Sequence, residues 1–229
     1  MTLPVVLIPG FMLDDTLWAD FVDAFPDDRE FIYASLRGGD SISGLARTIA
    51  EQLPERFVVA GFSLGGYVAR AIAEAFPART AGMILIATSL REDTPAQRQA
   101  KQDAVGALKQ GDFRGISRGA IQKSLHPARH DDTGLIRKIQ EMGKRLGAEA
   151  FIRQSGFIRD RITLHPIVCP VAVIAAQQDQ LRCYQEAVEL AQLTGSRVEV
   201  IEESGHMIPL EKPQQLAARV AAWLKAVNL

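Results

Sequence analysis

Apolar residues along the chain fall into two patterns, which are short continuous runs and longer segments with helical spacing. The continuous runs lie at Pro4–Ile8, Phe31–Ala34, Phe57–Ala60, Met83–Ala87, Val171–Ala175 and Val198–Ile201. Because apolar and polar residues do not strictly alternate within them, we expect strands that are buried on both faces of a sheet.

Helical spacing of apolar residues fills most of the segments between these runs. It is found at Thr16–Phe25, Ile42–Leu53, Leu64–Phe76 and Pro213–Val227. The third helix should stop at Pro77, and Pro213 stands at the first helical position of the last. Strands that alternate with helices in this way predict an α/β fold, in which helices cover both faces of a mostly parallel sheet.

One stretch, from about residue 90 to residue 164, breaks this alternation because it contains no convincing strand. Thr94 is a candidate helix cap with Gln97 three residues later. An apolar stripe at helical spacing follows, formed by Leu135, Ile139, Met142 and Leu146. We expect three or four helices here. The predicted organisation is therefore a core of residues 1–89 and 165–229 with a helical cap at 90–164.

Composition places the chain among ordinary soluble globular proteins. Of its 229 residues, 47% are hydrophobic and 23% are charged, and the formal net charge is −1. These values argue against disorder and against a nucleic-acid partner. The longest apolar runs fall well short of the roughly 18 residues of a membrane helix. Leu3–Ile8 lacks the flanks of a secretory signal, so we expect a cytoplasmic protein without membrane association.

The two cysteines and the uneven charge add two further expectations. Cys169 and Cys183 are too few and too far apart for a zinc pattern, so we expect both to be buried free thiols. Residues 91–161 hold 15 Lys and Arg but 9 Asp and Glu, a net charge of +6, whereas the remainder has a net charge of −7. Solvated helix faces explain this simply. The sharper alternative is a basic lid that attracts anionic substrates or an acidic carrier.

The strongest chemical signal is the pentapeptide Gly61-Phe62-Ser63-Leu64-Gly65, between a predicted strand and a predicted helix. A serine on such a sharp turn takes a strained backbone conformation that projects its hydroxyl away from the sheet. The two glycines lack the Cβ atoms that would collide across the turn. The helix N-terminus below favours negative charge. Ser63 is therefore predicted to be a nucleophile, and the simpler alternative is a serine cap on an ordinary turn.

A serine nucleophile needs a base, and His206 is the candidate. It follows the run Val198–Ile201 and precedes the last helix, so it lies in a loop at the carboxyl end of a strand. This rim of an α/β sheet is where ligands bind, and Ser63 lies there too. The other histidines lie in the predicted insertion or directly before a strand: His126, His130 and His165.

The base in turn needs a carboxylate that orients it, and Asp179 is the candidate. It follows Val171–Ala175, also at a carboxyl strand end, and the order Ser63, Asp179, His206 is a known order of such triads. The alternatives left open are Asp93, Glu202 and Glu203.

An acyl-transfer site also needs donors for the developing oxyanion. The N–H of Leu64 stands at the start of the helix, and the N–H of Phe11 lies in the loop after the first strand, beside Gly10. Met12 and Met207 are candidate substrate-binding residues.

Together these residues resemble the α/β-hydrolase superfamily over nearly the whole chain. The matching landmarks are Pro9-Gly10-Phe11, Trp18, Leu36-Arg37-Gly38, the Ser63 pentapeptide with Gly66, Asp179, Gly205-His206 and Glu211-Lys212-Pro213. The resemblance implies a Ser–His–Asp triad, an acyl-enzyme, a helical cap, no cofactor and no metal. It also implies a minimal sheet of about six strands. The chain departs from the family pattern at Pro9, Ser35 and Ala176-Gln177-Gln178.

The sequence thus predicts a serine hydrolase that acts on a small carboxylic ester or thioester, with a small-molecule acyl substrate that is anionic if the basic residues form a lid. A C–C bond hydrolase and an acyltransferase or perhydrolase would use the same triad. A ligand-binding protein on a hydrolase scaffold is the alternative from another class. The sequence makes no prediction of the oligomeric state.

Overall fold

The centre of the molecule is a six-stranded sheet in the order β2-β1-β3-β4-β5-β6, in which every neighbouring pair is parallel. The structure is a computed structural model that describes residues 2–108, 113–159 and 167–229. The strands are β1 (Val5–Ile8), β2 (Phe31–Tyr33), β3 (Phe57–Phe62), β4 (Thr80–Ile86), β5 (Val171–Ala176) and β6 (Val198–Ile201). The predicted fold class is confirmed, and each predicted strand end lies within three residues of its observed position.

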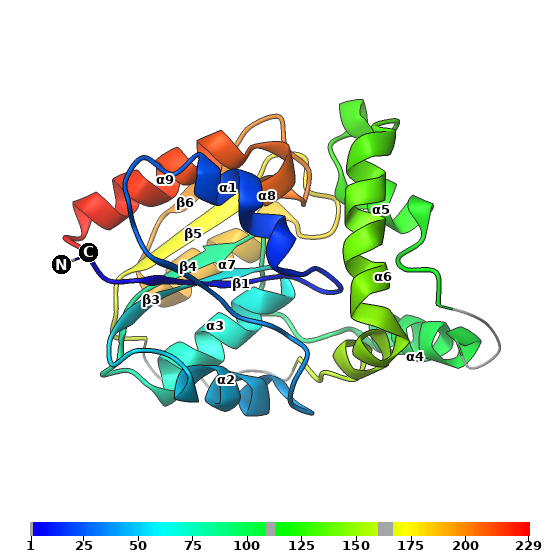
Figure 1. Cartoon of the computed structure of the whole chain (residues 1–229), viewed down its shortest axis with the longest axis horizontal. Coiled ribbons are helices and arrows are strands. Elements are labelled where there is room, and N and C mark those ends of the chain that lie inside the picture. Colours follow the sequence, from blue (N-terminus) through cyan, green and yellow to red (C-terminus); the bar gives the residue numbers. More distant parts are fainter. Residues whose placement is uncertain (1, 109–112, 160–166) are drawn as a thin grey trace.

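Helices cover both faces of this sheet, as predicted (Figure 1). One face packs against α2 (Ile42–Glu51), α3 (Leu64–Ala75) and α7 (Tyr184–Thr194). The other packs against the 3₁₀-helix η1 (Asp15–Trp18), α1 (Ala19–Asp23), α8 (Ile208–Glu211) and α9 (Pro213–Ala226).

Successive residues of a strand point to opposite faces, so the two cores share the sheet between them. In β1, Val5 and Leu7 belong to one core and Val6 and Ile8 to the other, and all four are 0% exposed. This burial on both faces explains the continuous apolar runs of the inner strands. In the edge strands β2 and β6 most residues are only partly buried, so the expectation is wrong there.

Between β4 and β5 the chain forms a group of helices at the carboxyl ends of the strands (Figure 1). They are α4 (Pro95–Leu108), α5 (Arg118–Ser124), the 3₁₀-helix η2 (Pro127–Arg129) and α6 (Thr133–Ser155). We call this group the inserted helices. Residues 109–112 and 160–164 of the predicted cap lie outside the described residues, so its limits at 90 and 164 stay a prediction.

Two local predictions in the inserted helices agree with the structure. The Thr94 N–H donates to Gln97 Oε1 at 2.9 Å, and the Gln97 N–H donates to Thr94 Oγ1 at 3.2 Å, so a reciprocal cap starts α4. In the stripe on α6, three residues are buried and Leu146 is half-buried. The next residue, Gly147, breaks the helix with φ 79° and ψ 176°.

The prediction of buried thiols is wrong for Cys183. Both cysteines are free, but Cys169 is half-buried and Cys183 is exposed. Cys183 caps the start of α7, in a loop at the rim of the sheet, so its side chain faces away from the core. Within the described ranges, the helices include none with the length and apolar character needed to cross a membrane.

Candidate active site

Ser63 occupies a strained turn between β3 and α3. Its backbone has φ 52° and ψ −112°, a conformation that side-chain-bearing residues rarely adopt. Two hydrogen bonds hold it there: the Ser63 N–H donates to Ile86 O at 2.9 Å, and the Thr88 hydroxyl donates to Ser63 O at 2.6 Å. Neighbouring β4 and the residues after it therefore hold the serine in place.

The glycines around Ser63 are required by close backbone contacts. A Cβ on Gly61 would lie 2.3 Å from Gly65 O, and a Cβ on Gly65 would lie 2.4 Å from Ile8 O. A Cβ on Gly66 would lie 2.4 Å from the hydroxyl of Thr88. No side chain fits at any of these positions unless the backbone or Thr88 moves.

The structure brings Ser63, His206 and Asp179 into one chain of hydrogen bonds. Ser63 Oγ lies 2.9 Å from His206 Nε2, and Asp179 Oδ2 lies 2.7 Å from His206 Nδ1. Since a carboxylate can only accept, Nδ1–H donates to Asp179 and leaves Nε2 to accept from the serine. The side chains of His206 and Asp179 are 5% and 2% exposed, so the hydrogen bond between them is shielded from water.

The Asp179 carboxylate is itself fixed by the backbone of its own loop. Its Oδ1 accepts from the N–H groups of Leu181 and Arg182 at 2.7 and 2.9 Å, which leaves Oδ2 for the histidine. The three side chains come from the carboxyl ends of three different strands, β3, β5 and β6, as the sequence predicted for this rim.

The alternative carboxylates have other positions. Asp93 is buried in ion pairs with Lys101 and with Arg159, the latter at 3.3 Å. Glu203 pairs with Lys212 at 3.0 Å, and Glu202 is exposed.

The other histidines also lie in different settings. His126 Nδ1 accepts from Ala128 N–H at 3.1 Å, and His130 Nε2 lies 3.3 Å from Leu125 O. His165 lies outside the described residues.

The two candidate oxyanion donors lie at the first turn of α3 and in the loop after β1. Among the backbone hydrogen bonds of the described residues, none is donated by Phe11 or Leu64. The Leu13 N–H donates to Gly10 O at 3.2 Å, which closes a four-residue turn around Phe11. Both N–H groups therefore stay free to donate to a substrate.

Residues 5–219 match the model of the alpha/beta hydrolase family. The chain belongs to this family. Over 251 aligned residues it is 28% identical to the biotin biosynthesis bifunctional protein BioHC of Cellvibrio japonicus, covering 96% of this chain and 47% of that protein. It is 33% identical over 94 residues to a pimeloyl-[acyl-carrier protein] methyl ester esterase of Pseudoalteromonas atlantica, and the match covers 37% of this chain and 36% of that protein. The chain thus spans less than half the length of these curated relatives.

Solved structures share the fold at lower identity. A thermophilic esterase from Thermogutta terrifontis superposes with a TM-score of 0.84 at 24% identity, covering 100% of this chain and 92% of that one. MenH from S. aureus superposes with a TM-score of 0.83 at 18% identity, covering 99% of this chain and 95% of that one.

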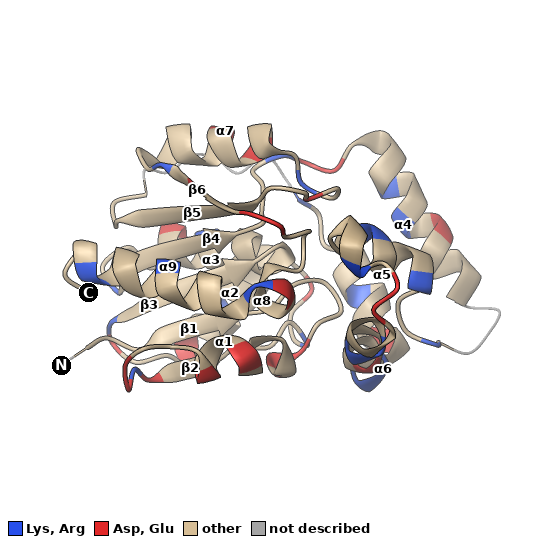
Figure 2. Ribbon diagram, turned by 90° about the horizontal axis from the view of Figure 1, so that it is seen from above, with Lys and Arg blue, Asp and Glu red and all other residues tan. Residues whose placement is uncertain are grey.

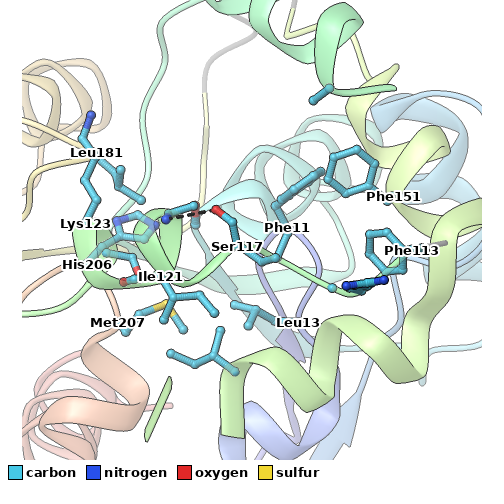
Figure 3. Close-up of a pocket in the computed structure, with 18 of the residues that line it drawn as sticks. Phe11, Leu13, Phe113, Ser117, Ile121, Lys123, Phe151, Leu181, His206 and Met207 are labelled. Atoms are coloured by element: carbon cyan, nitrogen blue, oxygen red, sulfur yellow. Dashed lines mark hydrogen bonds between the residues drawn. The ribbon is translucent and has the colours of Figure 1, made fainter. Parts of the chain in front are cut away.

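In this alpha/beta hydrolase, a cavity of about 680 Å³ lies between Ser63 and the inserted helices. Figure 3 shows His206 and Met207 on one side of it and Phe11, Phe113 and Phe151 on the other. The ring centroids of Phe11 and Phe113 each lie 5.5 Å from that of Phe151. Further apolar walls are Leu13, Phe62, Ala104, Ala107, Leu108, Ile116, Ala120, Ile121, Ile139 and Leu181.

The charged residues of the cavity wall are all basic in the part of the chain that the structure describes. Arg114 and Lys123 line the cavity, and neither Asp nor Glu does. More basic positions are spread over α4, α5 and α6 (Figure 2). The same described part contains no group of three or more His, Cys, Asp and Glu side chains placed to hold a metal ion.

Of the two candidate substrate-binding methionines, only Met207 lines the cavity. The Met12 side chain is 0% exposed and lies in the protein interior. Its backbone has a positive φ of 55°. The prediction for Met12 is therefore corrected.

The loop around His206 and the following helix α8 are held against the inserted helices by contacts that the sequence did not reveal. Glu211 on α8 accepts the N–H of His126 at 2.7 Å, and Met207 N–H donates to Ser124 O at 3.3 Å. A Cβ on Gly205 would lie 2.4 Å from His126 N. Burial raises the pKa of the Glu211 carboxyl above its usual range, against the opposing effect of backbone N–H groups. Glu211 appeared in the sequence only as part of a landmark, because its partner is 85 residues away.

Proposed function

We propose that this protein is a serine hydrolase that cleaves a small carboxylic ester or thioester through an acyl-enzyme. The observation that carries the proposal is the continuous hydrogen-bond chain from Asp179 through His206 to Ser63, whose hydroxyl borders an apolar cavity. The esterase names of a curated relative and of a solved structure with this fold agree with an ester substrate.

In the proposed mechanism, His206 Nε2 takes the hydroxyl proton as Ser63 Oγ attacks the substrate carbonyl carbon. The N–H groups of Phe11 and Leu64 donate to the oxygen on which negative charge develops. The imidazolium then gives its proton to the leaving alcohol or thiol, and the acyl group stays on Ser63. Water attacks the acyl-enzyme by the same route in reverse, and the Asp179 carboxylate stabilises the imidazolium in both steps.

The cavity favours an apolar substrate that carries an anionic group. Its volume is typical of a small-molecule site, and most of its wall is aliphatic or aromatic. The two cations on the wall, Arg114 and Lys123, attract a negative group. We therefore propose that the preferred ester has an apolar acyl part and an anionic group within reach of these side chains.

The decisive test is Ser63-dependent labelling and turnover. A fluorophosphonate probe should label the wild-type protein, and p-nitrophenyl esters of graded chain length should be hydrolysed. Ser63→Ala should abolish labelling and lower kcat/KM by about 10⁴-fold or more. Ser196→Ala is the matched control, because the Ser196 hydroxyl lies 2.8 Å from that of Thr194, shortly before β6 and at the opposite end of the sheet.

Equal labelling of Ser63→Ala and wild type would contradict the proposal. Product analysis with added alcohol or peroxide separates hydrolysis from acyl transfer, and a diketone substrate tests C–C bond cleavage.

A further inference from the structure

The last two turns of α6 lie against the loop that carries Phe11. The break at Gly147 separates these turns from the first part of α6. Phe151 and Gln154 follow the break and stand three residues apart, so they lie on the same face of the helix. That face meets the four-residue turn from Gly10 to Leu13.

Two contacts join this helix face to the turn. Gln154 Oε1 accepts the N–H of Met12 at 2.8 Å, and both groups are buried. The ring of Phe151 meets that of Phe11 edge-on, with centroids 5.5 Å apart and planes at 64° (Figure 3). Gln154 is 2% exposed, so water does not compete for its carboxamide.

The turn needs an outside partner because its conformation is strained. Met12 is the third residue of the turn and has φ 55°, at a position where glycine or asparagine is favoured. Its N–H would be buried without an acceptor if Gln154 were absent, which is unfavourable because a buried donor then loses its bond to water without replacement. Since the peptide unit between Phe11 and Met12 is planar, the acceptor that holds the Met12 N–H also fixes the orientation of that unit.

The next peptide unit back along the chain carries the N–H of Phe11. The Leu13 N–H to Gly10 O bond closes the turn around it, and the Phe151 ring holds the Phe11 side chain. Both flanks of Phe11 are therefore restrained, one by the turn itself and the other by α6.

We propose that Gln154 is a positioning residue for the oxyanion site: it holds the turn in the conformation in which the Phe11 N–H meets the developing oxyanion. The inserted helices thereby take part in transition-state stabilisation as well as enclosing the substrate. This inference rests on the proposed function, because it assigns a role to the Phe11 N–H in ester cleavage.

The test compares two variants that lose the same kind of side chain. Gln154→Met removes the acceptor for Met12 and keeps the length of the side chain. Gln122→Met is the control, because Gln122 Nε2 donates to His130 O at 2.9 Å within the inserted helices and does not contact the turn. Gln154→Met also loses the long hydrogen bond that Gln154 Nε2 donates to Leu36 O at 3.5 Å, whereas Gln122→Met loses one bond. The Tm of both variants is therefore measured beside their kinetics.

We expect Gln154→Met to lower kcat by about 10- to 100-fold, somewhat less than the loss of a whole oxyanion donor, with KM changed by less than about threefold. Affinity for a trifluoromethyl ketone, which forms a tetrahedral adduct with Ser63, should fall in parallel. Affinity for the product carboxylic acid should stay within about threefold, because the ground state needs the oxyanion donors less. Gln122→Met should keep wild-type kcat and ketone affinity.

Gln154→Glu is the second variant, because its carboxyl oxygen can still accept the Met12 N–H. A kcat closer to wild type than that of Gln154→Met supports the proposal. If Gln154→Met does not fold, a folded Gln154→Glu decides: kcat at a third or more of the wild-type value, or a larger loss with a parallel loss of ketone affinity, supports the role. A larger loss with unchanged ketone affinity overturns it.

The inference is also overturned if folded Gln154→Met keeps more than a third of wild-type kcat, or if Gln122→Met loses as much as Gln154→Met. These failures differ from a failure of the proposed function, in which the wild-type protein itself shows no Ser63-dependent turnover.

Discussion

The sheet with its covering helices and the inserted helices contribute to the site in different ways. The first region holds Ser63, His206 and Asp179 at the ends of strands, through close backbone contacts and hydrogen bonds. The second, together with residues 113–117 between α4 and α5, supplies most of the cavity wall, and it meets the rim through the Gln154 side chain and the His126 N–H. The three triad side chains thus lie on the closely packed sheet, whereas the insertion mainly shapes the cavity beside them.

Burial shows the same contrast between two helices. In α3, which begins directly after Ser63, nine of twelve residues are buried, whereas α4 has no buried residue among its fourteen. A helix that is packed on all sides tolerates little change, because interiors are close-packed. We therefore expect substitutions in α3 to affect folding and the triad, and substitutions in α4 to affect substrate choice.

The largest expected effect outside Ser63 concerns the orienting carboxylate. Asp179→Asn replaces the acceptor of the His206 Nδ1 proton with an amide and favours the wrong tautomer. By analogy with other triads, kcat should fall about 10⁴-fold. Steady-state kinetics measures this, and Asp93→Asn is the comparison, since Asp93 pairs with Lys101 and Arg159 instead. A loss under tenfold for Asp179→Asn would mean that another group orients the histidine.

Two glycine substitutions sharpen the contrast in packing. Gly61→Ala places a Cβ 2.3 Å from a backbone oxygen and should destabilise the fold by about 3 kcal/mol or more, with loss of probe labelling. Gly106→Ala, on α4, meets nothing within 4 Å and should stabilise the helix by about 1 kcal/mol, because alanine has the higher helix propensity. Thermal unfolding measures both. Equal effects of the two substitutions would remove the distinction between the regions.

The basic cavity wall should affect substrate choice and leave the chemistry intact. Arg114→Glu combined with Lys123→Glu should lower kcat/KM for an anionic ester by about tenfold, roughly 1.4 kcal/mol, and change that for a neutral ester of equal length much less. The difference should shrink as the salt concentration rises. Kinetics with paired esters at low and high salt measures this. A similar loss for both esters would show that the two cations do not select for charge.

The smallest expected effect is the pH dependence of stability that comes from Glu211, which joins α8 to the inserted helices. The pKa of Glu211 is raised on folding by burial, so the folded protein holds this proton more tightly than the unfolded chain. The stability that Glu211 contributes should therefore be greatest in acid and decline as the pH rises through the raised pKa. The Glu211→Gln variant is the reference, because its amide does not titrate in this pH range. The difference in Tm, wild type minus variant, should fall as the pH rises above the ordinary range of a glutamate, and a rising difference would contradict the assignment.

Local sequence patterns were sufficient for the strands and for the turn at Ser63. Most strands are continuous apolar runs, although Thr80 starts β4 and Glu199 lies within β6. The glycines around Ser63 are dictated by contacts within a few residues or across neighbouring strands. Asp179 and His206 could be selected because the end of a strand fixes where a following loop lies.

Other features could not be read from local pattern. Helix α7 was not predicted, because two of the four residues it buries, Ala187 and Ala191, are small and give only a weak stripe. Met12 has a positive φ outside any recognisable motif, and the acceptor of its N–H, Gln154, lies 142 residues away. Backbone strain could be predicted at Ser63, where a motif marks it, but not at Met12, and a single sequence does not show side-chain contacts over such separations.

The break at Gly147 divides α6 into two shorter helices that meet at a kink. The first helix lines the cavity beside Ser63 through Ile139, and the second binds the Met12 N–H in the turn that carries Phe11 through Gln154. Substitutions in the first helix can therefore adapt the cavity to a different substrate, while the second helix still holds the turn that carries Phe11. In one uninterrupted helix, a change in the part that lines the cavity would also shift the part that holds the turn.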